Sequence, residues 1–391
     1  MERIKAVACL VKRAVDEGDQ VVVVVSAMAG VTNRLVRYAN EINPLHDARE
    51  YDVIVASGEQ ITAGLTAMAL QELGVPARSW LGWQIRFQTD DAHSKARISG
   101  VETERLFERL GDGEVPVIAG FQGVTGANRV TTLGRGGSDT TAVALAAALR
   151  ADRCDIYTDV DGVYTTDPRI VAKARKLATI TFEEMLEMAS VGAKVLQTRA
   201  VELAMKYGVR LQVLSSFDDV PGTFVVGEEE VLEHEQVNGI TYSRDEAKIT
   251  LLRVADRPGV AAGIFGPLAE ANINVDMIVQ NISPQGDTTD LTFTVGKADL
   301  ERTVAVIRDL RDRIDYADLR YDPNVVKVSV IGVGMRSHAG IALRMFRTLA
   351  EKGINIQVIS TSEIKVSVLI EEAYTELAVR ALHSAYGLDA V

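Results

Sequence analysis

An internal repeat in the C-terminal part of the chain constrains its fold more than any other feature. GVAAGIFGPLAEANINVDMI (259–278) matches GIALRMFRTLAEKGINIQVI (340–359) at an offset of 81 residues, with nine identities in twenty positions. Each copy follows a β-type run and leads into a further strand and a helical segment. Two β-α-β-β-α units in tandem explain this pattern most simply. Because such small units do not cover their sheets alone, we expect them to pack on each other or on another chain.

Residues 1 to about 226 alternate between apolar strand candidates and helical segments. The strand candidates are rich in valine, as strands covered on both faces of a parallel sheet are. They occupy residues 21–25, 115–123, 154–160 and 209–217. The helical segments occupy residues 1–15, 60–73, 140–149 and 182–207. This alternation predicts an α/β/α sandwich with a mostly parallel sheet.

The acidic segment GEEEVLEHEQ (227–236) separates the two halves and is poor in large apolar residues. At 391 residues the chain is also longer than a single hydrophobic core usually supports, about 250–300 residues. We therefore predict an α/β domain over residues 1–230 and two ferredoxin-like β-α-β-β-α-β domains over residues 231–320 and 321–391.

Composition narrows the range of partners. The net charge of −12 disfavours nucleic acids and anionic membranes. Cys9 and Cys154 are the only cysteines and the five histidines lack metal-ligand spacing, so neither a disulfide framework nor a protein-held metal is expected. The first 15 residues carry charges every few positions, unlike a signal peptide, and no apolar run reaches the ~18 residues of a membrane span. We expect a cytoplasmic protein.

The segment TTLGRGGSDTTAVALAAAL (131–149) places a glycine cluster directly before a helix. Its glycines let the backbone approach a ligand closely, and a helix N-terminus offers unpaired N–H groups to an anion. The segment matches neither G-x-x-x-x-G-K-[ST] nor G-x-G-x-x-G. By itself it is equally compatible with an ordinary strand-to-helix connection.

Other small-residue turns accompany the remaining strands. They are SAMAGVTNRL (26–35), ASGEQITAG (56–64), GFQG (120–123) and YTDVDGVYTTDPR (157–169). Since ligands collect at the carboxyl ends of strands in an open parallel sheet, the five turns predict one shared cleft. The aspartates of the last turn do not form a calcium loop, because no glutamate occupies the twelfth position.

Phosphoryl transfer is the chemistry that such a cleft supports, because it needs positioning, hydrogen-bond donors and cations rather than a nucleophile of the protein. Arg135 could bind a carboxylate or phosphate in bidentate fashion, Lys194 could reach a phosphate, and Asp139 could orient a cation. Spacing alone is equally compatible with a surface lysine and an N-cap aspartate. Ser26 has no neighbouring base, which favours a hydroxyl donor or a helix cap over a nucleophile.

In this order, several segments resemble the aspartate kinases of the amino-acid kinase superfamily: SAMAGVTN, SGEQ, GFQG, TTLGRGGSDTTA, YTDVDGVYTTDPR and EEMLEMASVGAKVL. In the C-terminal half, DRPGVAAGIF, NINVDMIVQN and STSEIKVSVLI resemble the paired ACT domains of those enzymes. The resemblance spans essentially the whole chain. It implies transfer of the γ-phosphoryl group of ATP to the side-chain carboxylate of L-aspartate, with Mg²⁺ accompanying the nucleotide. This is the committed step toward lysine, threonine and methionine.

The resemblance also implies roles for individual residues. Arg135 matches the arginine that binds the α-carboxylate of aspartate, Glu59 the acid that binds its α-ammonium group, and Asp139 the aspartate that orients a catalytic lysine. The other matched positions are Thr32 and Phe121 in the aspartate pocket, Ser26, Gly136, Gly137 and Ser138 near the transferred phosphoryl group, and Thr158, Asp159, Tyr164, Asp167, Arg169 and Lys194 around the nucleotide.

The beginning of the chain departs from the family pattern. Family members open with a strand carrying K-[FY]-G-G-[TS]-S, whose lysine stabilises the transition state, whereas MERIKAV resembles the helix that follows it. Lys5 lacks flanking glycines and is no substitute. A start assigned too late and a catalytically impaired paralogue both explain this, and we expect the former because the other site residues are in place. A chain without this lysine should be slower by at least ~10²–10³-fold.

Because ACT domains pair and bind amino acids at their interface, the resemblance implies feedback inhibition by lysine, threonine or both. It also implies a homo-oligomer or a complex with an ACT-only subunit. Asn274 and Asn355 are equally compatible with simple turns before a strand. The positions that match inhibitor or interface contacts are Asp256, Asn274, Asp276, Gln280, Ile341, Asn355, Ser362 and Glu363.

Two other functions remain open from the sequence. A kinase for glutamate, N-acetylglutamate or a nucleoside monophosphate would share the sheet and the turns, but the RGGSD and SGEQ strings and the ACT pair argue against it. A non-catalytic amino-acid sensor is supported only by the absent lysine motif.

Overall fold

The computed structural model describes residues 1–391 except 193–194, 232–235, 283–286, 312, 339 and 390–391, and the chain divides into two compact units. The first unit comprises Met1–Val163, Ala178–Leu186 and residues 194–231. The second comprises Tyr164–Leu177, residues 187–193 and residues 232–391. The chain therefore passes between the units several times.

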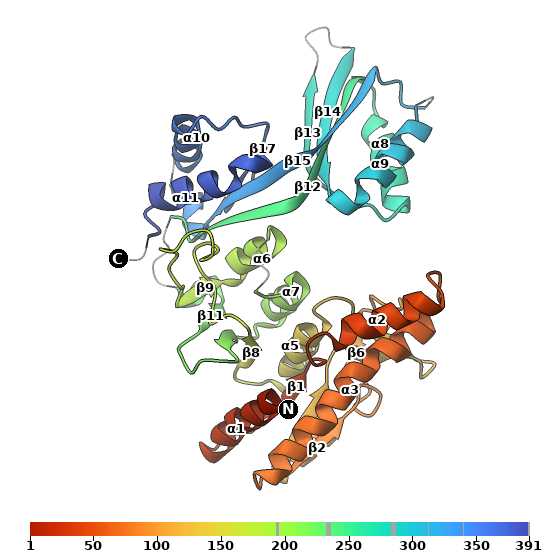
Figure 1. The fold of residues 1–391 in the computed structure, drawn as a ribbon, viewed down its shortest axis with the longest axis vertical. Helices are drawn as coiled ribbons and strands as arrows, with labels where there is room; N and C mark the ends of the chain where they lie inside the picture. Colours follow the sequence, from red (N-terminus) through yellow and green to blue (C-terminus); the bar gives the residue numbers. More distant parts are fainter. Residues whose placement is uncertain (193–194, 232–235, 283–286, 312, 339, 390–391) are drawn as a thin grey trace. The chain divides into compact units, whose positions relative to one another are not determined.

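The first unit is built of short strands and longer helices (Figure 1). Its helices are α1 (Glu2–Asp16), α2 (Val31–Ile42), α3 (Ala48–Glu72), α4 (Glu104–Gly111), α5 (Gly137–Leu149) and α7 (Thr198–Tyr207), and α6 (Phe182–Ser190) begins in it. Its strands are β1 (Val23–Val25), β2 (Ala77–Trp80), β3 (Gln88–Thr89), β4 (Ile98–Gly100), β5 (Val115–Ala119), β6 (Gln122–Val124), β7 (Val130–Thr132), β8 (Cys154–Thr158), β9 (Thr179–Thr181), β10 (Leu211–Ser215) and β11 (Thr223–Val226).

A three-stranded parallel sheet of order β1-β5-β2 is covered on both faces. Since neighbouring residues of a strand point to opposite faces, Val117 packs with Leu70 of α3 on one side of β5. Ile118 packs with Leu106 of α4 and Leu145 of α5 on the other side. This arrangement confirms the predicted α/β/α sandwich.

The remaining strands of the first unit form two further sheets, of order β8-β10-β11-β9 and β4-β3-β6-β7. β10 pairs in parallel with β8 and antiparallel with β11. The segment predicted as one strand over 115–123 is two strands, because the chain turns at Gly120 and Phe121, and Phe121 has a left-handed φ of 68°. The helix predicted over 182–207 is likewise two helices, α6 and α7.

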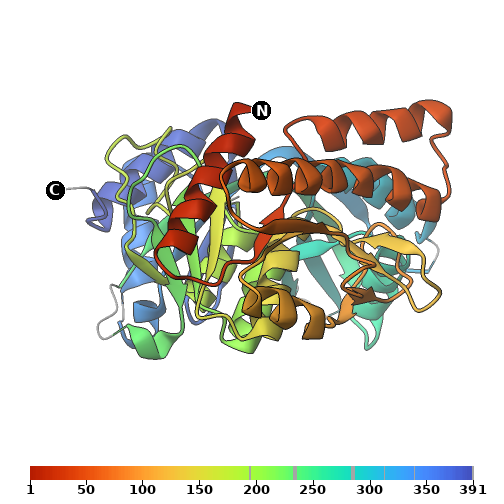
Figure 2. The same ribbon diagram turned by 90° about the horizontal axis from the view of Figure 1, so that it is seen from below.

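Helix α3 is the longest element of the first unit, and Figure 2 shows it running beside α2. Of the described helices, it alone is long and apolar enough to cross a membrane, but 56% of its apolar window is buried inside the protein. Its buried face also carries Asp52 and Glu59. These features are typical of a core helix rather than a membrane span.

The second unit contains both copies of the repeat, each as a β-α-β-β-α unit, as predicted. The first copy consists of β12 (Gly239–Ala255), α8 (Val260–Glu270), β13 (Val275–Ile282), β14 (Thr288–Val295) and α9 (Leu300–Asp309). The second consists of β15 (Asp318–Ile331), α10 (Ile341–Glu351), β16 (Val358–Thr361), β17 (Lys365–Glu371) and α11 (Thr375–Ala385).

The two copies share one antiparallel sheet of order β13-β14-β12-β15-β17-β16. β12 and β15 are long enough to serve both copies, and Figure 1 shows them extending through the whole sheet. The first residues of β12 pair with the end of β15 beside β17, whereas its later residues pair with β14. The domain boundary predicted after residue 320 therefore falls inside β15, and the boundary predicted after residue 230 stays a prediction.

A buried lysine stabilises the centre of this sheet. Lys327 of β15 is only 5% exposed, and its Nζ lies 2.7 Å from Glu246 of β12 and 2.5 Å from Asp276 of β13. A buried charge is tolerated only when it is paired, and removal of one partner leaves the other uncompensated.

Lys327→Met should therefore lower the stability of the second unit by about 3–5 kcal/mol, because Glu246 would stay buried without a cation. The double variant Lys327→Met/Glu246→Leu should recover most of this loss. Scanning calorimetry of the full chain measures both. Equal melting temperatures for the two variants would contradict this account of the sheet.

Candidate functional site

Glu59 is a buried carboxylate with one unsatisfied oxygen. It is 4% exposed, its Oε1 accepts a hydrogen bond from the Ala27 N–H at 3.1 Å, and its Oε2 has no hydrogen-bond partner among the described residues. Burial raises the pKa of Glu59 to about 7. The sequence prediction placed Glu59 in a turn just ahead of a helix, which is wrong, because α3 begins at Ala48 and Glu59 lies in its middle.

The turn after β1 lies directly against α3 at this point. A Cβ on Gly58 would approach Ala27 Cβ to 2.8 Å and Val31 Cγ1 to 3.3 Å, so only glycine allows this contact. Ser26 directly follows β1 and precedes Ala27, and Thr32 lies in the first turn of α2 beside Val31. Both predicted residues are thus on the segment that contacts Glu59.

The turn after β5 brings the glycine-rich segment to the same place. The Gln122 side chain accepts from Gln60 at 3.3 Å and donates to the Ala56 carbonyl at 3.1 Å, so β6 is attached to α3 on either side of Glu59. The preceding residue, Phe121, lies against Gly137, where a Cβ would approach its ring to 2.7 Å. Glu59, Phe121 and the start of α5 therefore form one continuous set of contacts.

The glycine-rich turn presents one exposed cation and one partly buried anion. Arg135 is exposed and has no ion-pair partner among the described residues. Ser138 follows at the start of α5, where a Cβ on Gly120 would come within 2.9 Å of Ser138 Oγ. Burial raises the pKa of Asp139 to about 6, opposed by a hydrogen bond from the Gln197 backbone N–H.

The predicted nucleotide residues are divided between the two units. Thr158 and Asp159 follow one another at the end of β8 in the first unit, and the Thr158 carbonyl accepts from Ser216 at 2.8 Å. Tyr164, Asp167 and Arg169 belong to the second unit. Lys194 lies outside the described residues.

Within the second unit, residues 164–177 are attached to the shared sheet and to α11. The Thr165 carbonyl accepts from the Ile240 N–H at 2.7 Å, and its Oγ1 lies 2.8 Å from Nε2 of the fully buried His383. Asp167 accepts from Arg169 at 2.8 Å and from the Tyr242 hydroxyl at 3.2 Å, and the Arg169 hydrogen bonds lower its pKa.

The predicted effector residues lie at several separate places in the second unit. Asp256 and Gln280 line one surface hollow at the N-terminus of α8. Asp276 is instead paired with Lys327, which lowers its pKa against the effect of burial. Asn274 and Asn355 are exposed before β13 and β16, Ile341 is the buried first residue of α10, and Ser362 and Glu363 lie between β16 and β17.

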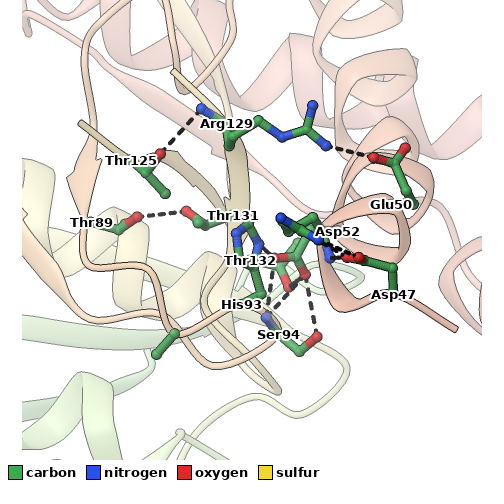
Figure 3. Close-up of polar contacts among 12 residues, drawn as sticks. Asp47, Glu50, Asp52, Thr89, His93, Ser94, Thr125, Arg129, Thr131 and Thr132 are labelled. Carbon is green, nitrogen blue, oxygen red and sulfur yellow. Dashed lines mark hydrogen bonds and ion pairs between the residues drawn. The ribbon is translucent and has the colours of Figure 1, made fainter. Parts of the chain in front are cut away.

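Several polar residues beside the site were not predicted from the sequence. Asp52 of α3 is buried and hydrogen-bonded to His93, Ser94 and Thr132 (Figure 3). Arg199 of α7 donates to the Leu133 and Ala96 carbonyls, both at 2.9 Å. The only sequence signal for Asp52 is its spacing of seven residues from Glu59, which places both carboxylates on one face of a helix.

This arrangement can bind a small zwitterion. A buried, unpaired carboxylate oxygen suits an ammonium group, and an exposed arginine at a glycine-rich turn suits a carboxylate. The start of α5 adds N–H groups and the Ser138 hydroxyl for an anion. Among the described residues, no group of three or more His, Cys, Asp and Glu side chains could hold a metal ion.

Comparison with known proteins identifies the family. Residues 1–215 match the sequence model of the amino acid kinase family, and residues 248–312 and 328–386 match ACT domain models. An aspartate kinase of Stutzerimonas stutzeri is 58% identical over 391 residues, and an aspartokinase of Pseudomonas aeruginosa is 57% identical over 392. In both alignments 100% of this chain matches 95% of the relative.

A solved structure gives the same result. Aspartokinase III of E. coli in complex with aspartate and ADP is similar with a TM-score of 0.82 and 27% identity, over 98% of this chain and 96% of that one. The chain therefore belongs to the aspartate kinases of the amino acid kinase family and carries two ACT domains.

Proposed function

We propose that the chain transfers the γ-phosphoryl group of ATP to the side-chain carboxylate of L-aspartate, giving 4-phospho-L-aspartate and ADP. A side-chain carboxylate oxygen forms the new bond to the γ-phosphorus, and the bond from that phosphorus to the β,γ-bridging oxygen breaks. The observation that carries the proposal is the unpaired Oε2 of buried Glu59. Glu59 lies on the part of α3 that Gln122 joins to Phe121, and Phe121 packs against Gly137 beside Arg135.

In this proposal the substrate is held by its two α-groups. Glu59 binds the α-ammonium group, and the Arg135 guanidinium binds the α-carboxylate through two parallel hydrogen bonds. Thr32 and Phe121 line the pocket around the carbon chain. The side-chain carboxylate then lies toward Ser26, Gly136, Gly137 and Ser138, whose donors stabilise the charge that develops on the transferred group.

The nucleotide brings negative charge that must be balanced. A Mg²⁺ ion that accompanies ATP would supply positive charge at the phosphates. Thr158, Asp159, Tyr164, Asp167 and Arg169 contact the nucleotide in this proposal, and Lys194 approaches its phosphates. Because burial raises the pKa of Asp139, its ionised form gains most from a cation beside it, which suits the lysine-orienting role implied by the resemblance.

We further propose that lysine, threonine or both regulate the enzyme through the second unit. Asp256 and Gln280 offer a carboxylate and an amide at the N-terminus of α8, where backbone N–H groups point outward. This combination suits an amino acid, whose ammonium and carboxylate groups need opposite partners. Pairing of ACT domains predicts a homo-oligomer or a complex with an ACT-only subunit, and we place the protein in the cytoplasm.

Arg135→Ala should raise the KM for aspartate by about 10- to 100-fold, because it removes a charge-assisted bidentate contact. The KM for ATP should change by less than about threefold. Arg129→Ala is a matched control, since Arg129 pairs with Glu50 on the surface at 2.6 Å. Hydroxamate formation from aspartate measures activity. Equal losses for both substrates would contradict the carboxylate role, and a parent protein that neither binds nor phosphorylates aspartate would contradict the proposed function.

Because the pKa of Glu59 is raised in the folded protein, the free energy of unfolding depends on pH, and the direction of that dependence can be predicted. A carboxyl whose pKa is about 7 in the folded protein and 4.5 in an unstructured peptide binds its proton more tightly in the folded state. Stability therefore falls as the pH rises from about 4.5 to 7. Glu59→Gln should be more stable than the parent at pH 8 by roughly 1–3 kcal/mol, with the difference shrinking toward pH 5.

Denaturant unfolding from pH 5 to 8 measures this difference, with exposed Glu50→Gln as the control. Aspartate should bind more tightly as the pH rises through 7, because its ammonium group needs the ionised carboxylate. Glu59→Gln should weaken aspartate binding at pH 8 despite its added stability. A variant that gained stability and kept full affinity would exclude Glu59 from the substrate pocket.

Gln280→Ala should raise the concentration of lysine or threonine needed for half-inhibition by about tenfold, since one hydrogen bond to a charged ligand is lost. The uninhibited kcat should stay unchanged, because Gln280 lies in the hollow at the N-terminus of α8 and is not among the residues proposed to contact aspartate or ATP. Asn324→Ala, an exposed amide of β15, is the control. If both variants are inhibited at the same effector concentrations, this hollow is not part of the effector site.

A further inference from the structure

Asp52 is a buried carboxylate of the first unit, and both of its oxygens accept hydrogen bonds. It is fully buried, its Oδ2 lies 2.7 Å from His93 Nδ1, and its Oδ1 accepts from the Thr132 hydroxyl at 2.6 Å. The Ser94 N–H lies 3.1 Å from both oxygens. Figure 3 shows these donors converging on Asp52 from two separate segments.

Such a cluster fixes geometry more than it adds stability. A buried carboxylate is costly unless every lone pair is satisfied, and this one is satisfied by donors from the loop between β3 and β4 and from the end of β7. Because the bonds are short and come from different segments, α3, the loop and β7 are held in one relative position.

The segments held by Asp52 lead directly into the substrate-binding turn. Thr132 lies three residues before Arg135, and its carbonyl accepts from the Ala96 N–H at 2.9 Å. Gly134 rests on the same loop, since a Cβ there would approach the Ser94 carbonyl to 3.3 Å. Thr132 and Gly134 are therefore both supported by the loop that Asp52 anchors.

Asp52 is also linked to Glu59, because both residues lie on helix α3. The two carboxylates are seven residues apart, which is about two turns or ~10 Å along one face of α3. One is saturated by donors of the protein, whereas the other keeps an unpaired oxygen. The path from Glu59 through α3, Asp52 and Thr132 reaches Arg135 after only two intervening residues, Leu133 and Gly134.

We propose that Asp52 is a positioning residue, which sets the separation between Glu59 and Arg135 through Thr132. This inference rests on the proposed function. The α-ammonium and α-carboxylate groups of aspartate share one carbon atom, so both contacts form only when the two side chains are correctly spaced. Loss of the spacing loosens the substrate and turns its side-chain carboxylate away from the phosphoryl group, where small misplacements have large effects on rate.

Asp52→Asn tests the proposal because it keeps the volume but offers an N–H₂ group where the donors of the protein converge. It should lower kcat/KM for aspartate by about 10- to 100-fold and weaken aspartate binding in calorimetry, with the KM for ATP within about threefold of the parent. Glu50→Gln, an exposed carboxylate of the same helix, should match the parent protein in every measurement.

A second pair of variants covers the case in which Asp52→Asn does not fold. Thr132→Val removes only the 2.6 Å hydrogen bond and should reproduce most of the aspartate defect, whereas Thr132→Ser keeps the hydroxyl and should restore affinity. Melting temperatures are recorded for each, and assays run well below them.

The outcomes distinguish a failure of the positioning role from a failure of the proposed function. If the parent binds and phosphorylates aspartate but Thr132→Val does so equally well, or loses aspartate and ATP alike, the positioning role is wrong and the proposed function stands. If the parent neither binds nor phosphorylates aspartate, the proposed function fails and the inference with it.

Discussion

Helix α3 carries two carboxylates, Asp52 and Glu59, into the interior of the first unit. The geometry of the site depends on the hydrogen bonds that each of them accepts there. Asp52 accepts hydrogen bonds from His93, Ser94 and Thr132, so both of its buried oxygens are paired within the protein. Glu59 receives one hydrogen bond and keeps an unpaired oxygen. The first carboxylate has its hydrogen-bond partners within the protein, whereas the second has an oxygen that a ligand could reach.

Close backbone contacts make this arrangement possible. Gly58 lets the turn after β1 touch α3, Gly120 lets Ser138 approach β5, and Gly137 makes room for Phe121. Each contact would be blocked by a single methyl group. The small residues of the sequence thus matter less for their flexibility than for the distances that they permit between elements which carry the charged side chains.

Much of this could be predicted from the sequence, for physical reasons. The repeat, the apolar strands and the glycine turns are local patterns, and they predict the sandwich, both β-α-β-β-α units and the positions of Arg135, Ser138 and Asp139 at a helix start. Glu59 was misplaced because GEQ between small residues looks like a turn, whereas burial against the sheet holds it in a helix. Neither the Asp52 cluster nor the sharing of β12 and β15 leaves a local signature, since both depend on pairing between distant segments.

The attachment of residues 164–177 to the second unit has a consequence for how such proteins can be recombined. This segment interrupts the first unit in sequence, yet its partners are Ile240 in β12 and His383 in α11. A chimera joined at the acidic segment would therefore combine residues 164–177 of one parent with the sheet and helix of the other. The two halves of the sequence differ in composition, but residues 164–177 of the first half pack within the second unit. An exchange of regulatory halves between two such proteins must therefore transfer this short internal segment as well.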